Sequence, residues 1–199
     1  MNYRAVDSWQ SLVSNDHKRL KDIISRLNSQ ICSSDDWPFL QRYYTYKLPA
    51  GQTKIENPVD GKINIICING NEYSYSSDYK SFVVNQPMVG KYSTYAQNIY
   101  LPAFSEDVTL EILYNTDNSA IDKSQAEKQY LEFEDDESLI PDVFQEPLLV
   151  YGACMRLKSN PDHNKFKYWY SMYNDALSIM RAKTAITSGS SAKIKIERS

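Results

Sequence analysis

The first periodic pattern along the chain is helical. Apolar residues recur every three or four positions, with charged residues between them, through about residues 15–31. The stripe consists of Leu20, Ile23, Ile24, Leu27 and Ile31. This spacing is typical of an amphipathic helix whose apolar face packs against another element. Residues 33–38, Ser-Ser-Asp-Asp-Trp-Pro, end the pattern.

From about residue 40 to residue 114 the period changes to two, which predicts strands. In 43–48 the even positions alternate with the odd ones, and in 63–68 Ile63, Ile65 and Cys67 alternate with their neighbours. Asn69-Gly70-Asn71 follows directly and predicts a tight hairpin, because Asn-Gly supplies the positive φ angles that such a turn requires. Further predicted strands are 81–84, 98–101 and 108–114. Recurrent Pro and Gly turns between them favour a small antiparallel sandwich or barrel.

The next segment, residues 115–138, is polar and contains five carboxylates within Glu132–Glu137. Adjacent like charges repel one another when they are brought together. The segment is therefore predicted to be a mobile loop.

The helical period returns with Ile140, Phe144, Leu148, Tyr151 and Met155. Pro147 lacks an N–H and favours the first turn of a helix, which predicts a short turn over 141–145 and a helix over 147–158. The small pair Gly152-Ala153 allows another helix to approach closely. A last helix is predicted from Asn160-Pro161 to about Lys183. Its stripe is Phe166, Trp169, Tyr170, Tyr173, Leu177 and Met180.

Together these patterns predict an α+β fold in which a three-helix bundle, one N-terminal helix plus a C-terminal helix pair, carries an inserted small β-sandwich or barrel. Residues 1–36 and 137–184 form the discontinuous helical domain, and 37–116 form the inserted β domain. Residues 117–136 are the polar acidic loop, and 185–199 are a flexible, extended C-terminal arm. Within that arm Lys193-Ile194-Lys195-Ile196 alternates like a strand without a partner nearby.

Composition narrows the function classes. The chain has 199 residues, 42% of them apolar and 24% charged, with a net charge of −3, so it is globular and not a basic nucleic-acid binder overall. It has 16 Tyr but 6 Gly, and neither G-x-G-x-x-G nor the P-loop motif occurs. The first seven residues lack a basic segment followed by an apolar core, which predicts neither secretion by that route nor a membrane span.

Candidate chemistry is sparse. Cys32, Cys67 and Cys154 form no C-x-x-C pair, and the two histidines, His17 and His163, lack metal-binding spacing. A Cys154/His163 nucleophile pair is conceivable, but a buried structural cysteine is favoured because free Cys behaves as a small hydrophobe. The acidic run contains no glycine to turn a calcium loop. We therefore predict a protein that is not an enzyme, with no catalytic, cofactor-binding or metal-binding residues; a hydrolase using Cys154 or Glu132–Glu137 is the remote alternative.

Aromatic residues offer a different kind of candidate. Lys165–Tyr170 interleaves lysines with aromatic rings, as single-stranded nucleic-acid binders do, but on a helix the rings share one face and are better explained by packing. Ten tyrosines lie between Tyr43 and Tyr114. Tyrosine joins a flat apolar ring to a polar tip, which suits protein or sugar contacts. A subunit-contact role is favoured over a carbohydrate-binding module, since no polar cluster nearby marks a pocket.

Four short strings stand out along the chain. They are Trp37-Pro38-Phe39-Leu40; Tyr46-Lys47-Leu48-Pro49-Ala50-Gly51 leading to Lys54-Ile55; Asn98-Ile99-Tyr100-Leu101-Pro102 followed by Leu110-Glu111-Ile112-Leu113-Tyr114; and Leu139-Ile140-Pro141-Asp142-Val143-Phe144 leading to Leu148-Leu149-Val150-Tyr151-Gly152-Ala153. In this order and spacing they resemble the head-to-tail adaptor (connector) proteins of tailed bacteriophages, the ring below the portal in short-tailed phages. The resemblance covers about residues 10–183. Neighbouring head-completion and tail-tube families have a comparable organisation.

The resemblance implies a structural virion protein of the neck and tail region, assembled in the host bacterial cytoplasm. Its partners would be the portal protein, a tail or nozzle protein, and further copies of itself in a ring, commonly of twelve. DNA would pass through the lumen without sequence recognition, and no membrane would be involved. The family carries no catalytic residues. On this hypothesis Lys193–Ile196 orders on a neighbouring subunit by strand addition.

Overall fold

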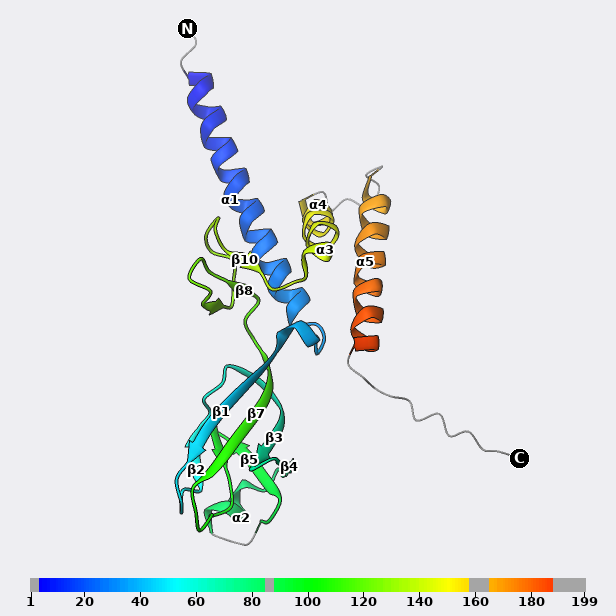
Figure 1. Ribbon diagram of the computed structural model, residues 1–199. Coiled ribbons are helices and arrows are strands. Elements are labelled where there is room, and N and C mark those ends of the chain that lie inside the picture. Colours follow the sequence, from blue (N-terminus) through cyan, green and yellow to red (C-terminus); the bar gives the residue numbers. More distant parts are fainter. Residues whose placement is uncertain (1–3, 85–87, 158–164, 188–199) are drawn as a thin grey trace, which may run out of the picture. The chain divides into compact units, whose positions relative to one another are not determined.

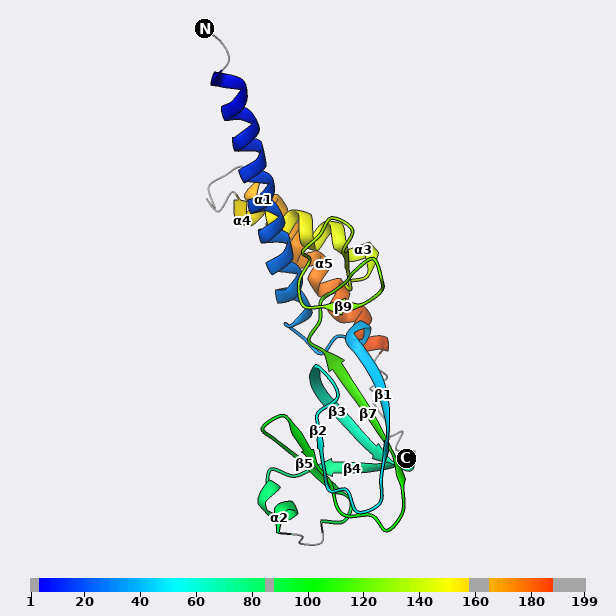
Figure 2. The same ribbon diagram turned by 90° about the vertical axis from the view of Figure 1, so that its left-hand side faces the viewer.

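The computed structural model describes residues 4–84, 88–157 and 165–187, with side chains from residue 17 to residue 184 of these ranges. The chain divides into two compact units (Figures 1 and 2). Unit 1 comprises residues 1–39 and 119–199, and unit 2 comprises residues 40–118. We predicted an inserted β domain over 37–116.

Unit 2 is built on one curled seven-stranded sheet in the order β1-β7-β3-β4-β5-β6-β2 (Figure 1). Every neighbouring pair is antiparallel except β4 and β5, which are parallel. β1 and β2, although consecutive in sequence, form the two edges of the sheet. The strands are β1 (Gln41–Leu48), β2 (Lys54–Glu56), β3 (Gly61–Ile68), β4 (Asn71–Tyr75), β5 (Lys91–Tyr95), β6 (Asn98–Tyr100) and β7 (Val108–Thr116).

The predicted fold class is therefore wrong. The structure is a mixed α+β fold dominated by this curled sheet, not a three-helix bundle with a small sandwich or barrel inserted in it. Two physical reasons explain the error. Period-two patterns show which residues form strands but not that seven of them join in one sheet. The helix predicted over 147–158 also differs, because Pro147 lies in the first turn of a π-helix over Glu146–Val150 and the α-helix begins only at Tyr151, with seven residues.

Alternation along the strands sets the core of unit 2. In β1 the even residues Tyr44 and Tyr46 are half-buried and Leu48 is buried, as predicted. In β3 the register shifts between Ile63 and Ile65, which indicates a bulge. One extra residue reverses the side-chain parity along β3, and beyond the bulge Ile66 and Ile68 are buried whereas Ile65 and Cys67 are only half-buried. The cluster comprises Leu48, Ile55, Val59, Ile66, Ile68, Tyr92, Ile99, Leu101, Val108, Leu110 and Ile112.

Two local predictions for unit 2 have opposite outcomes. The hairpin at Asn69-Gly70 is confirmed, with φ angles of 48° and 76°. The strand predicted over 81–84 is wrong, because the segment is helix α2 (Tyr79–Val83). Asp78 caps this helix by accepting hydrogen bonds from the backbone N and the hydroxyl of Ser81, at 3.3 and 2.5 Å.

Unit 1 contains the remaining helices and a small three-stranded sheet. α4 packs against both α1 and α5 (Figure 1). The short strands pair antiparallel in the order β10-β8-β9, within and beside the predicted acidic loop. A 3-10 turn, η1 (Pro38–Leu40), joins α1 to β1. The other elements are α1 (Arg4–Cys32), β8 (Ala120–Ile121), β9 (Glu127–Lys128), β10 (Glu137–Ser138), α3 (Asp142–Gln145), the π-turn η2 (Glu146–Val150), α4 (Tyr151–Leu157) and α5 (Phe166–Thr187).

The helices of unit 1 pack through one close approach. A Cβ atom on Gly152 would overlap Leu27 Cδ2 and would lie 3.2 Å from Cε2 of Tyr173. Gly152 of α4 therefore lets side chains of α1 and α5 reach its backbone, which confirms the close approach predicted there. The buried apolar residues around it are Leu27, Ile31, Trp37, Ile140, Phe144, Leu148, Ala153, Ala176 and Met180.

Helix bounds differ from the predictions in instructive ways. α1 begins at Arg4 and not near residue 15, because Trp9 and Val13 continue its apolar spacing. It ends where the indole Nε1 of Trp37 donates to the Ile31 carbonyl at 2.7 Å, which satisfies one of the last carbonyls of the helix. α3 matches the predicted turn over 141–145. The predicted start of the last helix lies outside the described residues.

Candidate functional site

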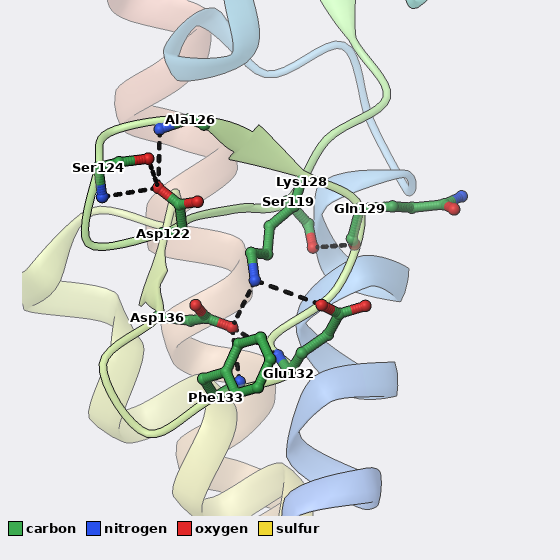
Figure 3. A network of polar contacts seen from close by, with 9 residues as sticks. All are labelled: Ser119, Asp122, Ser124, Ala126, Lys128, Gln129, Glu132, Phe133 and Asp136. Atoms are coloured by element: carbon green, nitrogen blue, oxygen red, sulfur yellow. Dashed lines mark hydrogen bonds and ion pairs between the residues drawn. The ribbon is translucent and has the colours of Figure 1, made fainter.

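The segment that joins β8, β9 and β10 carries a polar network in unit 1 (Figure 3). Lys128 Nζ lies 3.1 Å from Asp136 Oδ2 and 3.4 Å from Glu132 Oε2, and the ammonium group stacks over the Phe133 ring at 4.8 Å. Asp136 also accepts hydrogen bonds from the backbone N of Glu132 and of Phe133, at 2.6 and 2.7 Å. The acidic residues are thus held by a lysine and by backbone donors.

Electrostatics of this network follow from its geometry. Backbone hydrogen bonds from Phe133 and Glu132, together with Lys128, hold the pKa of Asp136 below its usual value. Burial alone would lower the pKa of Lys128, but hydrogen bonds to Asp136 and Glu132 outweigh it and raise that pKa. Both groups therefore stay charged over the physiological range.

Outside this centre, the exposed carboxylates pair with separate lysines. Glu134 lies 2.7 Å from Lys21 Nζ of α1, and Asp135 lies 3.4 Å from Lys123. The hydrogen bond from Lys21 lowers the pKa of Glu134. The expected mutual repulsion of the acidic run is thus offset by Lys21, 113 positions from Glu134, and by Lys123, 12 positions from Asp135.

Asn28 of α1 binds the same segment through hydrogen bonds to Ser119 and Ser138. It is fully buried, its amide donates to the carbonyl and hydroxyl of Ser119 at 2.8 and 3.0 Å, and its Oδ1 accepts from the Ser138 hydroxyl at 2.5 Å. Ser119 in turn donates to the Gln129 carbonyl at 2.7 Å. The sequence signal for this contact is Asn28 itself, a polar residue beside Leu27 in the apolar stripe of the helix.

A groove of about 630 Å³ lies in unit 1 between α1 and residues 130–132. Its walls carry more basic than acidic groups, although Lys21 already pairs with Glu134. Sequence reasoning missed this groove, because its two walls are more than 100 positions apart. The lining residues are Lys18, Lys21, Asp22, Ser25, Arg26, Tyr130, Leu131 and Glu132.

In unit 2, exposed apolar side chains occur on and just after α2, before β5 and at the end of β5, which packs on α2. Val83, Val84 and Val89 are 60%, 66% and 84% exposed, and Tyr95 is 52% exposed. The ring of Tyr95 stacks on that of Tyr79, with centroids 4.0 Å apart and planes within 1° of parallel. We call these five residues the α2 surface. Burial and the neighbouring Tyr95 raise the pKa of Tyr79, so the Tyr79 phenol stays neutral.

The tyrosines predicted as a contact surface divide into two groups. Tyr92 is buried and meets Tyr75 edge-on at 5.6 Å, so it serves packing. Tyr43, Tyr75 and Tyr95 are more than half exposed. The hydroxyl of Tyr43 donates to Glu111 Oε1 at 2.5 Å, and this hydrogen bond raises the pKa of Tyr43.

The cysteines and histidines considered for chemistry form no reactive site in the described residues. Cys32 is buried, and burial raises its thiol pKa to about 12. Cys67 and Cys154 are half-buried and free, and burial also raises the pKa of Cys67. His163 lies outside the described residues. Within those ranges the structure brings no three His, Cys, Asp or Glu side chains together as metal ligands, and it contains no helix long and apolar enough to cross a membrane.

The aromatic stripe predicted on the last helix is only partly buried. Met180 is 1% exposed and Trp169 and Tyr173 are half-buried, whereas Tyr170 is 57% exposed. Tyr170 and Phe166 stack with centroids 6.4 Å apart. Assigning Tyr170 to the core was therefore wrong, because α5 contacts its neighbours along a narrower face than the stripe covers.

Comparison with known proteins identifies no relative: a scan of protein-family models and a search of curated proteins both returned no match for this chain.

Proposed function

We propose that this protein is a structural subunit of the head-to-tail adaptor class, which assembles with copies of itself between a phage portal and tail. The observation that carries the proposal is the α2 surface. Its residues lie on or beside α2 and β5, which pack on each other, and exposed apolar side chains on neighbouring elements are typical of interaction sites. Tyrosine and aliphatic residues are suited to the cores of such interfaces.

The order of elements adds support. A long helix of 29 residues precedes the sheet of unit 2, and the helices α3 to α5 follow it. The four strings that resemble the adaptor family fall on η1, β1, β2, β6, β7 and the α3 to α4 segment. They lie on several elements of both units, so the resemblance does not rest on one local motif.

The carbohydrate-binding alternative is less well supported by the same surface. A sugar ring stacks on a free aromatic face, whereas Tyr79 and Tyr95 cover one face of each other. The exposed valines offer no hydrogen bonds to hydroxyl groups. The α2 surface therefore suits an apolar protein partner better than a sugar.

Mass photometry of the full chain, with and without a candidate phage portal ring, tests the proposal. We expect the portal to gain mass in steps of one chain up to a complete ring. A chain that stays monomeric and never adds to portal at micromolar concentration would refute the adaptor assignment.

A matched pair of variants connects this result to the α2 surface. Val83→Asp with Val89→Asp places charges in the surface and should weaken assembly at least tenfold, as expected for losing about 1.4 kcal/mol of contact. Ala103→Asp places a charge at another exposed apolar position of unit 2 and should leave assembly unchanged. Equal effects of the two variants would show that the α2 surface is not an interface.

A further inference from the structure

Of the two edge strands of the sheet in unit 2, β1 is the longer. β1 has eight residues and pairs with β7 on one side, and among the described residues no strand pairs with its other side. A long edge strand presents unpaired N–H and C=O groups, which form a template for another strand.

The register shows which residues present those groups. Asn69 N donates to the Thr109 carbonyl at 2.9 Å, and Thr109 N donates to Asn69 Oδ1 at 2.8 Å, so the backbone of Thr109 faces away from β1. Groups alternate along an antiparallel ladder. The backbone of Lys47, which lies opposite Thr109, therefore faces the free edge, and so do those of Thr45 and Tyr43.

The same alternation defines the side chains that an added strand would meet. Tyr43, Thr45 and Lys47 are exposed on the outer face, whereas Tyr44 and Tyr46 are half-buried on the core face. A groove of about 350 Å³ continues the core face beside Tyr46. An added strand thus needs apolar residues at every second position, with polar or basic residues between them. The groove is lined by Tyr46, Gln52, Lys54, Ile55, Glu56, Asn57 and Pro58.

The opposite edge of the sheet is a poorer acceptor. β2 has three residues, and the side-chain amide of Gln52 already donates to the Lys54 carbonyl at 3.1 Å. Chain direction along the sheet is antiparallel at all but one pair. These features favour antiparallel addition at β1.

We propose that the free edge of β1 binds the C-terminal segment Lys193–Ile196 of a second copy of this chain as an added antiparallel strand. Twelve residues, 188–199, lie beyond the described end of α5, and among them Lys193-Ile194-Lys195-Ile196 has the required alternation. The isoleucines face Tyr44, Tyr46 and the groove. The lysines lie on the outer face, where Glu111 of β7 supplies a carboxylate opposite Thr45.

This inference rests on the proposed function only in naming a second copy as the donor, and it makes a chemical prediction of its own. In antiparallel pairing, residues directly opposite each other have side chains on the same face. The lysines therefore lie opposite Tyr43, Thr45 or Lys47, and it is the backbone N–H groups of Lys193 and Lys195 that donate to β1. Those of the isoleucines face away.

Fluorescence anisotropy with a labelled peptide of residues 188–199 tests the inference. The receptor is the full chain carrying Ile194→Ser and Ile196→Ser, so that its own segment does not compete. We expect saturable binding, weakened about tenfold or more by N-methylation of Lys195, since one backbone hydrogen bond is lost and the methyl group blocks approach. N-methylation of Ile194 should change binding less than about twofold.

Receptor variants locate the acceptor edge. Thr45→Pro removes an N–H that faces the free edge and should abolish binding without breaking the ladder to β7. Glu56→Pro, the matched change on β2, lies beside the groove and should weaken binding less than Thr45→Pro does. Glu106→Pro, at an exposed position of unit 2 outside the groove, should leave binding unchanged. Circular dichroism establishes that each variant is folded, and the N-methyl pair gives the answer even if Thr45→Pro does not fold.

Three results would overturn the inference. They are no peptide binding at 1 mM, equal loss from the two N-methyl positions, and loss with Glu56→Pro but not with Thr45→Pro. Mass photometry of the wild-type chain separates the donors: a strict monomer that blocks added peptide would show that the segment binds within its own chain. Because none of these measurements uses portal, their failure is distinguishable from failure of the adaptor assignment.

Discussion

Unit 1 and unit 2 are each stabilised internally by a different kind of contact. Unit 2 is a ladder of strand pairs, most of them between segments that alternate clearly, and its core follows from that alternation. Unit 1 depends on single contacts between distant segments, such as Asn28 with Ser119 and Ser138, which are 91 and 110 positions away. A repeated pattern spreads its stabilisation over many residues, whereas unit 1 concentrates it in a few.

The largest effect on stability should come from Gly61 of β3, where the neighbouring strand β7 leaves no space for a side chain. Gly61 has a φ of 153°, and a Cβ there would overlap the Asn115 carbonyl. Because backbone atoms of β7 cannot move aside, Gly61→Ala should lower the free energy of unfolding by about 4 kcal/mol. Urea denaturation measures it. Gly51→Ala, at another positive φ but in open space, is the control and should cost about 1 kcal/mol.

Next in size is the loss of the buried amide in unit 1. Asn28→Ala leaves the Ser138 hydroxyl and the Ser119 groups without their partner and opens a cavity, which should cost about 3 kcal/mol. Amide hydrogen exchange should show faster opening of β8 and β10 and little change in unit 2. Ser29→Ala, the half-buried neighbour, should be nearly neutral. Uniform loss of protection in both units would contradict this division.

Gly152→Ala sharpens the contrast with Gly61. The added methyl meets side chains, Leu27 and Tyr173, and not backbone. Side-chain ends can rotate away, so the expected cost is about 2 kcal/mol. The measurement is the urea midpoint. The double variant with Leu27→Ala should cost less than the sum of the single changes, and strict additivity would show that the contact with Leu27 does not limit the packing.

A pH effect should separate the units further. The pKa of Asp136 is lowered on folding, so its contribution to stability is fully present above the ordinary carboxyl pKa of about 4. This contribution is lost as the pH falls through the lowered pKa. Protection of the Glu132 and Phe133 amides should therefore decline in acid before that of β3 and β7. Asp136→Asn should remove the decline, whereas Asp135→Asn, in an exposed pair, should retain it.

The smallest predicted effect is an increase in the stability of unit 2. Ser93 is fully buried in β5, and within the described ranges its hydroxyl has no hydrogen-bond partner. Ser93→Ala removes an unsatisfied polar group and should raise the free energy of unfolding by about 1 kcal/mol. Thermal melting checks the sign. A lower melting temperature would show that the hydroxyl is satisfied by water.

The sequence by itself determined the local conformations. Asn69-Gly70 required a tight hairpin, the even positions of β1 and β7 selected the buried face, and Gly152 predicted a close helix contact. Each depends on neighbouring residues alone, through φ angles, alternation or side-chain size. Local reading failed where a single residue changes the outcome, as with the bulge in β3 and the Asp78 cap that makes 79–83 a helix.

Only the tertiary structure decided how these pieces combine. Seven strands joined in one sheet, with consecutive β1 and β2 at opposite edges, cannot be read from periodicity, because a strand pattern does not name its partner. The same holds for the cations that offset the acidic run, and for the α2 surface, whose residues are ordinary core candidates until burial is known. Pairing and burial depend on segments that are distant in sequence, and for that reason the free edge of β1 became visible only in the folded chain.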